Sequence, residues 1–211
     1  MKLSIIDYSI GNVQSIFNAI TFTRDDIEII VTSDQKIILE SDAVILPGVG
    51  AYQKAMNELD KRNLPAVLSE FISSGKPLLG ICLGMQLLLN SSEEFGFADG
   101  LSLSEGLVKK FPDTIQDKLP HVSWNSLIGN ESNWDKGILH GVSTDDDFYF
   151  VHSYICHPKN PDTILASTSY GGVEFCSVFQ YNNIYGCQFH PEKSATQGLQ
   201  ILNNFIDIAS K

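Results

Sequence analysis

Basic residues and long apolar runs are scarce in this chain of 211 residues. Lys and Arg together number 14 against 25 Asp and Glu, which gives a formal net charge of −11. Such a charge argues against nucleic acid as a partner, because binding its phosphate backbone depends on Lys and Arg. No stretch of 18 apolar residues occurs, so no membrane-spanning helix is expected.

Cysteine is also scarce, and its four positions do not form a C-x-x-C pair. This spacing fits neither a disulfide framework nor a cysteine zinc site. The histidines and the short acidic runs show no metal-ligand spacing either, so neither a metal nor a cofactor is expected. The first residues lack the charged and apolar regions of a signal peptide. We therefore expect a reduced, cytoplasmic protein. Because no linker or repeat interrupts the chain, we expect one domain over residues 1–211.

Short apolar runs alternate with helical periodicity in the first half of the chain. Strands are predicted over 3–8, 27–31, 42–46 and 77–81, and helices over 13–20, 55–59 and 66–72. These strands are apolar at nearly every position, as in parallel sheets buried on both faces. The alternation therefore predicts an α/β fold with a mostly parallel central sheet and helices on both faces.

The second half of the chain changes to strands joined by short turns. Strands are predicted over 106–111, 147–155, 164–169, 173–180 and 184–189, followed by an amphipathic helix over 195–209. We therefore expect an additional mixed or antiparallel sheet region beside the parallel core. Ligands of such sheets bind beyond the carboxyl ends of the parallel strands.

Residues 80–84, Gly-Ile-Cys-Leu-Gly, have the form of a nucleophile elbow with cysteine as the nucleophile. Glycines flank the nucleophile in such turns because the backbone is cramped and strained there. The elbow would place the Cys82 sulfur at a helix N-terminus, where the helix dipole favours the thiolate. From this pentapeptide alone, a buried structural cysteine between two packing glycines is as good an interpretation as a nucleophile.

A second motif near the other end of the chain favours the interpretation of Cys82 as a nucleophile. It is His190-Pro191-Glu192, which follows an apolar strand. A thiol nucleophile needs a base within hydrogen-bond reach, and the base needs an orienting group. Pro191 restricts the backbone between the two side chains. His190 and Glu192 can therefore supply both roles from a single loop.

Together, residues 80–86 and 190–192 resemble the triad-type (class I) glutamine amidotransferases. More narrowly, the chain is similar to the family of glutaminase subunits of imidazole glycerol phosphate synthase, an enzyme of histidine biosynthesis. The stretches that carry the resemblance extend over nearly the whole chain, at residues 6–8, 11–12, 46–50, 120–125, 150–154 and 189–194.

The resemblance implies hydrolysis of glutamine to glutamate and ammonia by Cys82, His190 and Glu192. The oxyanion formed on the amide would be bound by the backbone N–H groups of Leu83 and of the Gly48–Val49 peptide. By the same resemblance, four residues would hold the glutamine: Gly50, Gln86, Ser153 and Tyr154.

No phosphosugar-binding machinery is visible, so the ammonia is expected to pass to another chain. The resemblance implies a heterodimer with a (β/α)₈-barrel cyclase, which makes imidazole glycerol phosphate and aminoimidazole carboxamide ribotide. Five residues would lie at or near that interface: Asn12, Trp124, Asn125, Tyr149 and Lys193.

The chain departs from the family pattern at Ser9 and Ser123, where glycine is usual. Ser123 could alter the loop beside the ammonia exit, so a relative that feeds a sugar amidotransferase of surface-polysaccharide biosynthesis stays an alternative. A cysteine peptidase and a non-catalytic binding subunit are further alternatives. The position of Gln86 and the compact loop at 47–50 count against the peptidase, and the intact triad counts against the binding subunit.

Overall fold

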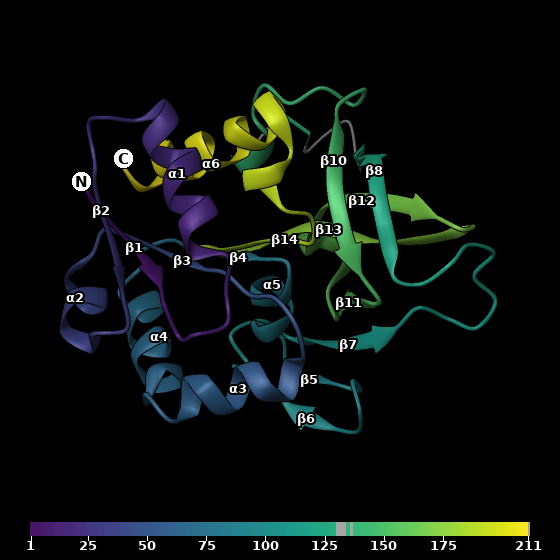
Figure 1. Ribbon diagram of the computed structural model, residues 1–211, viewed down its shortest axis with the longest axis horizontal. Helices are drawn as coiled ribbons and strands as arrows, with labels where there is room; N and C mark the ends of the chain where they lie inside the picture. Colours follow the sequence, from purple (N-terminus) through teal and green to yellow (C-terminus); the bar gives the residue numbers. More distant parts are fainter. Residues whose placement is uncertain (130–133, 136, 211) are drawn as a thin grey trace.

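The computed structural model describes residues 1–129, 134–135 and 137–210. One large mixed sheet runs through the molecule, and a separate two-stranded sheet stands beside it (Figure 1). Five neighbouring strands of the large sheet are parallel, in the order β2 (Glu28–Thr32), β1 (Lys2–Ile6), β3 (Ala43–Leu46), β4 (Leu78–Ile81) and β14 (Ile184–Cys187). This half is the predicted parallel core.

The large sheet continues beyond β14 in mainly antiparallel pairs. Next come β13 (Val173–Tyr181), β11 (Tyr154–Pro158), β7 (Gly106–Lys110), β5 (Ser91–Ser92) and β6 (Ala98–Asp99). β12 (Ile164–Tyr170) pairs with β13 and with β9 (Ile128–Gly129). The predicted mixed region is therefore confirmed, and it joins the parallel half through the β13–β14 hairpin.

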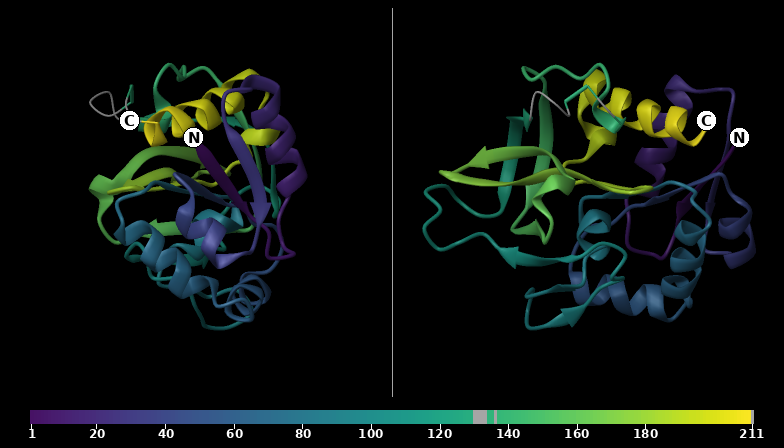
Figure 2. Two further views of the ribbon diagram at one scale, coloured as in Figure 1. Left: turned by 90° about the vertical axis from the view of Figure 1, so that its left-hand side faces the viewer. Right: turned by 180° about the vertical axis from the view of Figure 1, so that it is seen from behind.

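Helices cover both faces of the parallel half (Figures 1 and 2). α1 (Val13–Thr23) and α6 (Ala195–Ala209) pack together on one face. The other face carries α2 (Gln35–Glu40), α3 (Tyr52–Asp60), α4 (Leu64–Ser73) and α5 (Leu83–Leu87). Three short 3-10 helices complete the secondary structure of the described residues: Gly137–Leu139, Pro161–Thr163 and Pro191–Lys193.

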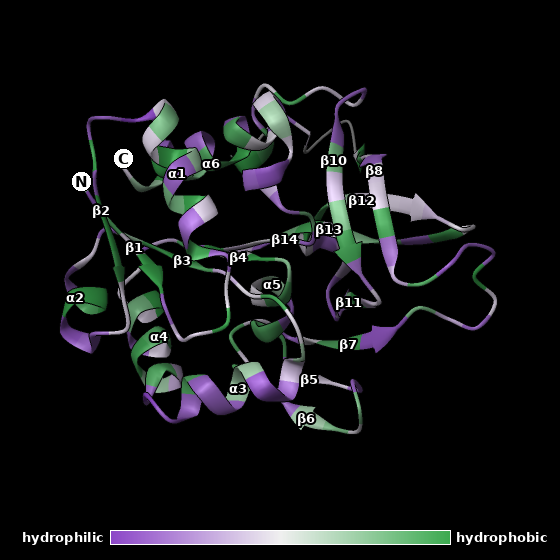
Figure 3. Ribbon diagram, in the orientation of Figure 1, coloured by the Kyte–Doolittle hydropathy of each residue, from purple (hydrophilic) through white to green (hydrophobic). Residues whose placement is uncertain are grey.

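Alternate side chains of each central strand point to opposite faces of the sheet and so fill two separate cores. In β1, Leu3 and Ile5 pack with α1 and α6, whereas Ile6 packs with the helices of the other face. All three are completely buried, which contributes about 1.5–3 kcal/mol each. Figure 3 shows the result: apolar central strands, with polar residues along the outer sides of α1 and α3.

The predicted strand over 147–155 is wrong, because two strands on different sheets occupy it. β10 (Asp147–His152) pairs with β8 (His121–Ser126) in the two-stranded sheet, and β11 begins at Tyr154 in the large sheet. The pattern of buried residues shows the break. Every second residue is buried in β10, at 148, 150 and 152, whereas the adjacent residues 155 and 156 are buried in β11. Ser153 lies at this crossing, and its carbonyl accepts a hydrogen bond from the N–H of Phe111.

Candidate active site

Cys82 lies at a sharp turn between β4 and α5. Its backbone has φ 53° and ψ −112°, a conformation that costs about 1–3 kcal/mol in a residue other than glycine. Two backbone hydrogen bonds hold it there: its N–H donates to the carbonyl of Cys187 at 2.8 Å, and its carbonyl accepts from the N–H of Gln86 at 3.3 Å. The elbow geometry expected from the sequence is therefore present, with the thiol at the start of a helix.

The two glycines of the elbow lie where an added side chain would collide with backbone. A Cβ on Gly84 would overlap the carbonyl oxygen of Leu46, and one on Gly80 would lie 2.8 Å from the carbonyl of Gly84. Because both neighbours are backbone atoms of the central sheet and the turn, they cannot move aside. The glycines thus let the turn pack directly on the end of β3.

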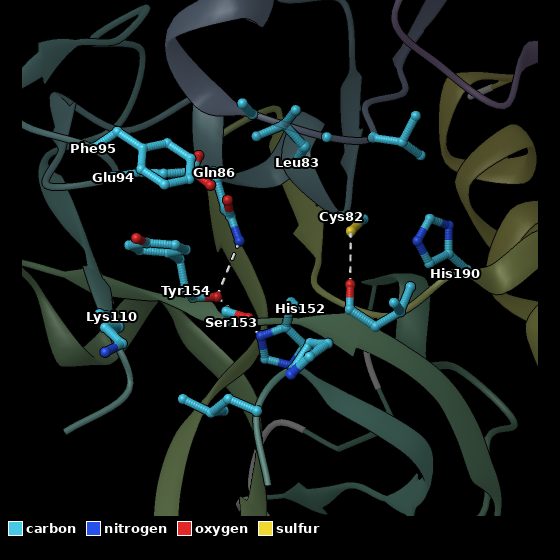
Figure 4. A pocket seen from close by; sticks show the side chains of 16 residues that line it. Cys82, Leu83, Gln86, Glu94, Phe95, Lys110, His152, Ser153, Tyr154 and His190 are labelled. Atoms are coloured by element: carbon cyan, nitrogen blue, oxygen red, sulfur yellow. Dashed lines mark hydrogen bonds between the residues drawn. The ribbon is translucent and has the colours of Figure 1, made fainter. Parts of the chain in front are cut away.

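His190 lies beside Cys82, after the end of the neighbouring strand β14 (Figure 4), and Glu192 follows it in the same loop. The Nδ1–H of His190 donates to Oε1 of Glu192 at 2.8 Å, which leaves Nε2 as the nitrogen available to Cys82. The two side chains are 3% and 0% exposed, so little water competes for this hydrogen bond. The structure thus brings the three residues of the predicted triad together, with His190 between Cys82 and Glu192.

The pKa of His190 is raised to about 10 by its partners. Burial of the ring acts in the opposite direction, but the thiolate charge of Cys82 and the hydrogen bonds to Cys82 and Glu192 outweigh it. A folded-state pKa above the ordinary value means that the protonated imidazolium of His190 is favoured at neutral pH. The arrangement can therefore hold a proton on His190 that the sulfur has released.

Further hydrogen bonds fix the loop that carries His190. Its N–H donates to the carbonyl of Tyr149 in β10 at 2.9 Å, and its carbonyl accepts from the hydroxyl of Ser194 at 2.7 Å. The Asn12 amide at the start of α1 donates to Oε1 of Glu192 at 3.3 Å and makes no helix-capping bond. Asn12, expected at a partner interface, thus contacts the triad itself.

The loop at 47–50 packs against the elbow. The Tyr8 hydroxyl donates to the carbonyl of Pro47 at 2.7 Å, and Gly48 contacts Leu83 and Gly84 so closely that no side chain would fit there. Gly50 has φ +86° and faces open space. The Gly48–Val49 peptide therefore lies near the backbone of Leu83, the other predicted oxyanion donor.

A cleft of about 620 Å³ opens over Cys82. Its walls include every residue predicted to bind the glutamine or its oxyanion: Val49, Gly50, Leu83, Gln86, Ser153 and Tyr154. Cys82 and His190 lie at one end, and Gln86 and Tyr154 lie further along it (Figure 4). Glu192 lies outside the cleft, buried behind His190.

Two charged residues at the far end of the cleft were missed in the sequence. Glu94 and Lys110 line it on the side away from Cys82 (Figure 4). Glu94 is fixed by the N–H of Tyr52, which donates to its carboxylate at 2.6 Å. Neither residue is distinguishable in the sequence from the other surface charges, because each depends on a fold contact between distant segments.

Two buried histidines link the cleft to the two-stranded sheet. His152 lines the cleft, and its Nδ1–H donates to the carbonyl of Tyr154 at 2.9 Å. Its Nε2 therefore accepts from His121 Nδ1 at 3.0 Å. Burial lowers the pKa of His152 to about 3, so its ring is neutral. His121 in turn contacts Asn125 at 2.8 Å and Ser123 at 2.9 Å, which ties both of these residues to the interior.

The remaining residues expected at a partner interface cluster on the outer side of the two-stranded sheet. Trp124 is 48% exposed, and its ring centre lies 5.9 Å from that of Tyr149. The Lys193 ammonium lies 5.9 Å from the centre of the Tyr149 ring. Val122 and Val49 are exposed as well. Trp124, Tyr149 and Lys193 thus lie together on this side as two aromatic rings with one cation beside them.

Within the described residues no group of three or more His, Cys, Asp or Glu side chains could hold a metal ion. All four cysteines are free thiols. No helix of the described part of the chain is long and apolar enough to cross a membrane.

Comparison with known proteins first identifies the class of protein to which this chain belongs. The family profile "Glutamine amidotransferase class-I" matches residues 4–209. Solved structures agree in fold: one titled as a glutamine amidotransferase superimposes with a TM-score of 0.72 at 15% identity, covering 99% of both chains. The PurLQS structure from Thermotoga maritima gives 0.72 at 14% identity, covering 98% of both chains.

Curated relatives narrow the class. The imidazole glycerol phosphate synthase subunit HisH 1 of Legionella pneumophila (strain Lens) is 40% identical, covering 98% of this chain and 99% of the relative. HisH of Bacillus cereus is 44% identical, covering 96% of this chain and 93% of the relative. HisH of Methanothermobacter thermautotrophicus is 45% identical, covering 98% of both chains. The chain therefore belongs to the HisH family of class I glutamine amidotransferases.

Proposed function

We propose that this chain is the glutaminase subunit of an imidazole glycerol phosphate synthase, acting in the cytoplasm as a single amidotransferase domain over residues 1–211. It would hydrolyse glutamine and pass the ammonia to a (β/α)₈-barrel cyclase in a heterodimer. The observation that carries the proposal is the cleft, which has a cysteine–histidine pair at one end and the opposite charges of Glu94 and Lys110 at the other (Figure 4). The identity of 40–45% to HisH relatives supports the choice of synthase.

The cleft suits an amino acid with an amide side chain. Free glutamine carries an ammonium and a carboxylate at one end and a neutral amide at the other. Glu94 would pair with the ammonium and Lys110 with the carboxylate, and the amide carbon would then lie near Cys82. A peptide bond would lack these free charges, so the two residues also argue against a peptidase.

The reaction would begin with transfer of the Cys82 proton to Nε2 of His190. The thiolate attacks the amide carbon, a carbon–sulfur bond forms, and the carbonyl electrons move to the oxygen, where the N–H groups of Leu83 and Val49 bind the charge. As the intermediate collapses, the carbon–nitrogen bond breaks and His190 gives its proton to the leaving nitrogen, which departs as ammonia. Water then cleaves the thioester, with His190 as base, and releases glutamate and free Cys82.

Growth of a histidine auxotroph tests the proposed function. A strain that lacks only its glutaminase subunit, and that expresses this chain with the cyclase from the same source, should grow without histidine. The same strain with the Cys82→Ala chain serves as control and should need histidine. If neither strain grows without histidine, the histidine assignment is overturned. That result would favour the alternative, a glutaminase that serves a sugar amidotransferase.

Substitutions in the base and the orienting residue should differ in severity. His190→Ala should lower kcat by at least about 10³-fold, because every proton transfer of the proposed reaction loses its carrier. Glu192→Gln should lower it by a smaller factor, since the amide oxygen can still accept from Nδ1 but carries no charge to stabilise the imidazolium. Glutamate release in the assembled complex measures both effects, with Glu174→Gln, an exposed carboxylate on β13, as control. A larger loss in Glu192→Gln than in His190→Ala would contradict the assigned roles.

A further inference from the structure

Gln188 is a buried polar residue for which the reaction described above has no use. It lies two residues before His190 and is 0% exposed. Its N–H donates to the carbonyl of Ser177 in β13 at 2.9 Å, which fixes the backbone. A buried carboxamide is costly unless its own donors and acceptor are paired, so its partners indicate what the site requires.

The partners of Gln188 are Gln86 and Cys82. Its Oε1 lies 3.0 Å from Nε2 of Gln86, and its Nε2 lies 3.8 Å from the sulfur of Cys82. The sulfur also lies 4.0 Å from the carbonyl oxygen of Val151. Gln188 therefore brings a side-chain N–H to the sulfur.

A backbone carbonyl fixes the direction of these hydrogen bonds. The oxygen of Tyr154 can only accept, so the atom of Gln86 that lies 3.1 Å from it must be the nitrogen. The same nitrogen faces Gln188, whose nearer atom must then be the oxygen. Its nitrogen is thereby turned toward Cys82. Reversing the Gln86 amide would set its oxygen against the carbonyl oxygen of Tyr154, and reversing the Gln188 amide would set two N–H donors against each other.

We propose that Gln188 is a catalytic residue whose carboxamide N–H binds the Cys82 sulfur and favours its thiolate form, with Gln86 as the positioning residue that orients this carboxamide. The inference rests on the proposed glutaminase function and adds a donor to its nucleophile. An N–H donor stabilises an anionic sulfur more than a neutral thiol. The only bond change is transfer of the thiol proton to Nε2 of His190.

The arrangement also gives Gln86 a role that differs from the expected one. Both hydrogens of its amide are used by Tyr154 and Gln188, so among the described residues its nitrogen is occupied by protein. Tyr154 and Gln86 both line the cleft. The seating of glutamine and the orientation of the donor on the sulfur would thus depend on the same two residues.

Alkylation of Cys82 by iodoacetamide tests the proposal without glutamine or partner. The pH at which half of the maximal alkylation rate is reached should rise by about one unit or more in Gln188→Met, which keeps the size of the side chain but has no donor. It should rise further in Gln188→Glu, which places a carboxylate beside the thiolate. Mass spectrometry of the Cys82 peptide follows this cysteine alone.

Gln180→Glu is the matched control. The Gln180 amide also donates to a backbone carbonyl, that of Asn182, but it has no contact with Cys82. The midpoint should stay at the wild-type value in this variant. The other titratable side chains close enough to interact with the sulfur are unchanged in all variants: Tyr8, Cys156, Cys187 and His190.

A measurement on the unmodified chain covers the case in which the buried variants do not fold. In wild-type protein the side-chain amide proton resonances of Gln188 should titrate with the alkylation midpoint of Cys82, and those of Gln180 should not. The inference would be overturned by an unchanged alkylation midpoint in folded Gln188→Met. It would also be overturned if the Gln188 resonances did not shift when Cys82 titrates. If the midpoint shifts but no synthase is supplied with ammonia, the proposed function fails while the role of Gln188 at the sulfur stands.

In the assembled complex, Gln188→Met should also lower kcat/KM for glutamine by about tenfold or more at neutral pH, and part of this loss should be recovered at higher pH. A purely structural role would give a loss that does not depend on pH.

Discussion

Glutamine-dependent synthesis should be lost when Cys82 is replaced by alanine, whereas synthesis from added ammonium salts should continue. The sulfur is the only group of the protein that is proposed to form a bond to the substrate carbon, so its removal should lower the glutamine-dependent rate by more than about 10⁴-fold. In the proposed function the cyclase performs the step that consumes ammonia, and that step would not involve Cys82. The two rates are measured on the same reconstituted complex.

Cys176→Ala is the matched control for this experiment. Cys176 is also a buried free thiol, but it lies in β13, away from the cleft. We expect it to keep most of its glutamine-dependent activity and to lose only some stability from the smaller side chain. Glutamine hydrolysis at near the wild-type rate in Cys82→Ala would refute the role of the thiol. Loss of the ammonium-dependent rate as well would show that the substitution disrupts the complex and not the chemistry.

Local patterns in the sequence predicted the parallel core and the elbow. The strands at β1, β3 and β4 are apolar on both faces, and the spacing of the glycines around Cys82 has few structural explanations. The helix over 195–209 was predicted with the bounds that the structure has, because its apolar stripe has a clear helical period. These features depend on residues close together in the chain.

The missed features depend on contacts between distant segments. β8 was not predicted, since His121 and Asn125 are polar and their pairing with β10 and His152 appears only in the fold. α2 was also missed and is an exception, because it is a short helix capped locally by Asp34, whose carboxylate accepts from the N–H of Ile37. The charges at the far end of the cleft and the donor on the sulfur were missed for the same reason: nothing in their local sequence separates them from other Glu, Lys and Gln residues.

The surface expected to meet the cyclase is connected by hydrogen bonds to His190, the proposed base. Tyr149 contacts Trp124 and Lys193 on the outer side, and its carbonyl accepts from the N–H of His190 on the inner side. The Ser194 hydroxyl joins the same two segments, because it accepts from the N–H of Tyr149 and donates to the carbonyl of His190. A partner that presses on Tyr149 or Lys193 would therefore act on the loop that carries His190.

The loop at 47–50 offers a second route from the surface to the site. Val49 is 40% exposed, whereas Gly48 is packed on the elbow. An oxyanion donor works only when its N–H points at the developing charge. A peptide next to glycine can rotate at low steric cost, so the Gly48–Val49 peptide can present either its N–H or its C=O. A resting state that presents the C=O would leave Cys82 idle and would avoid releasing ammonia when no acceptor is ready.

We therefore expect the isolated chain to be a poor glutaminase that the partner activates. Addition of the cyclase with its own substrate bound should raise kcat for glutamine hydrolysis by about a thousandfold, which corresponds to roughly 4 kcal/mol. The shift cannot exceed the difference in the partner's affinity for the two states of the loop, and one protein interface can supply this amount. Trp124→Ala should reduce the activation and leave the rate of the isolated chain unchanged. Phe22→Ala, an equally large change at an aromatic residue of α1 that is 82% exposed, should affect neither. Glutamate release, measured with and without the liganded partner, separates the two rates, and full activity of the isolated chain that no partner changes would refute this control by the interface.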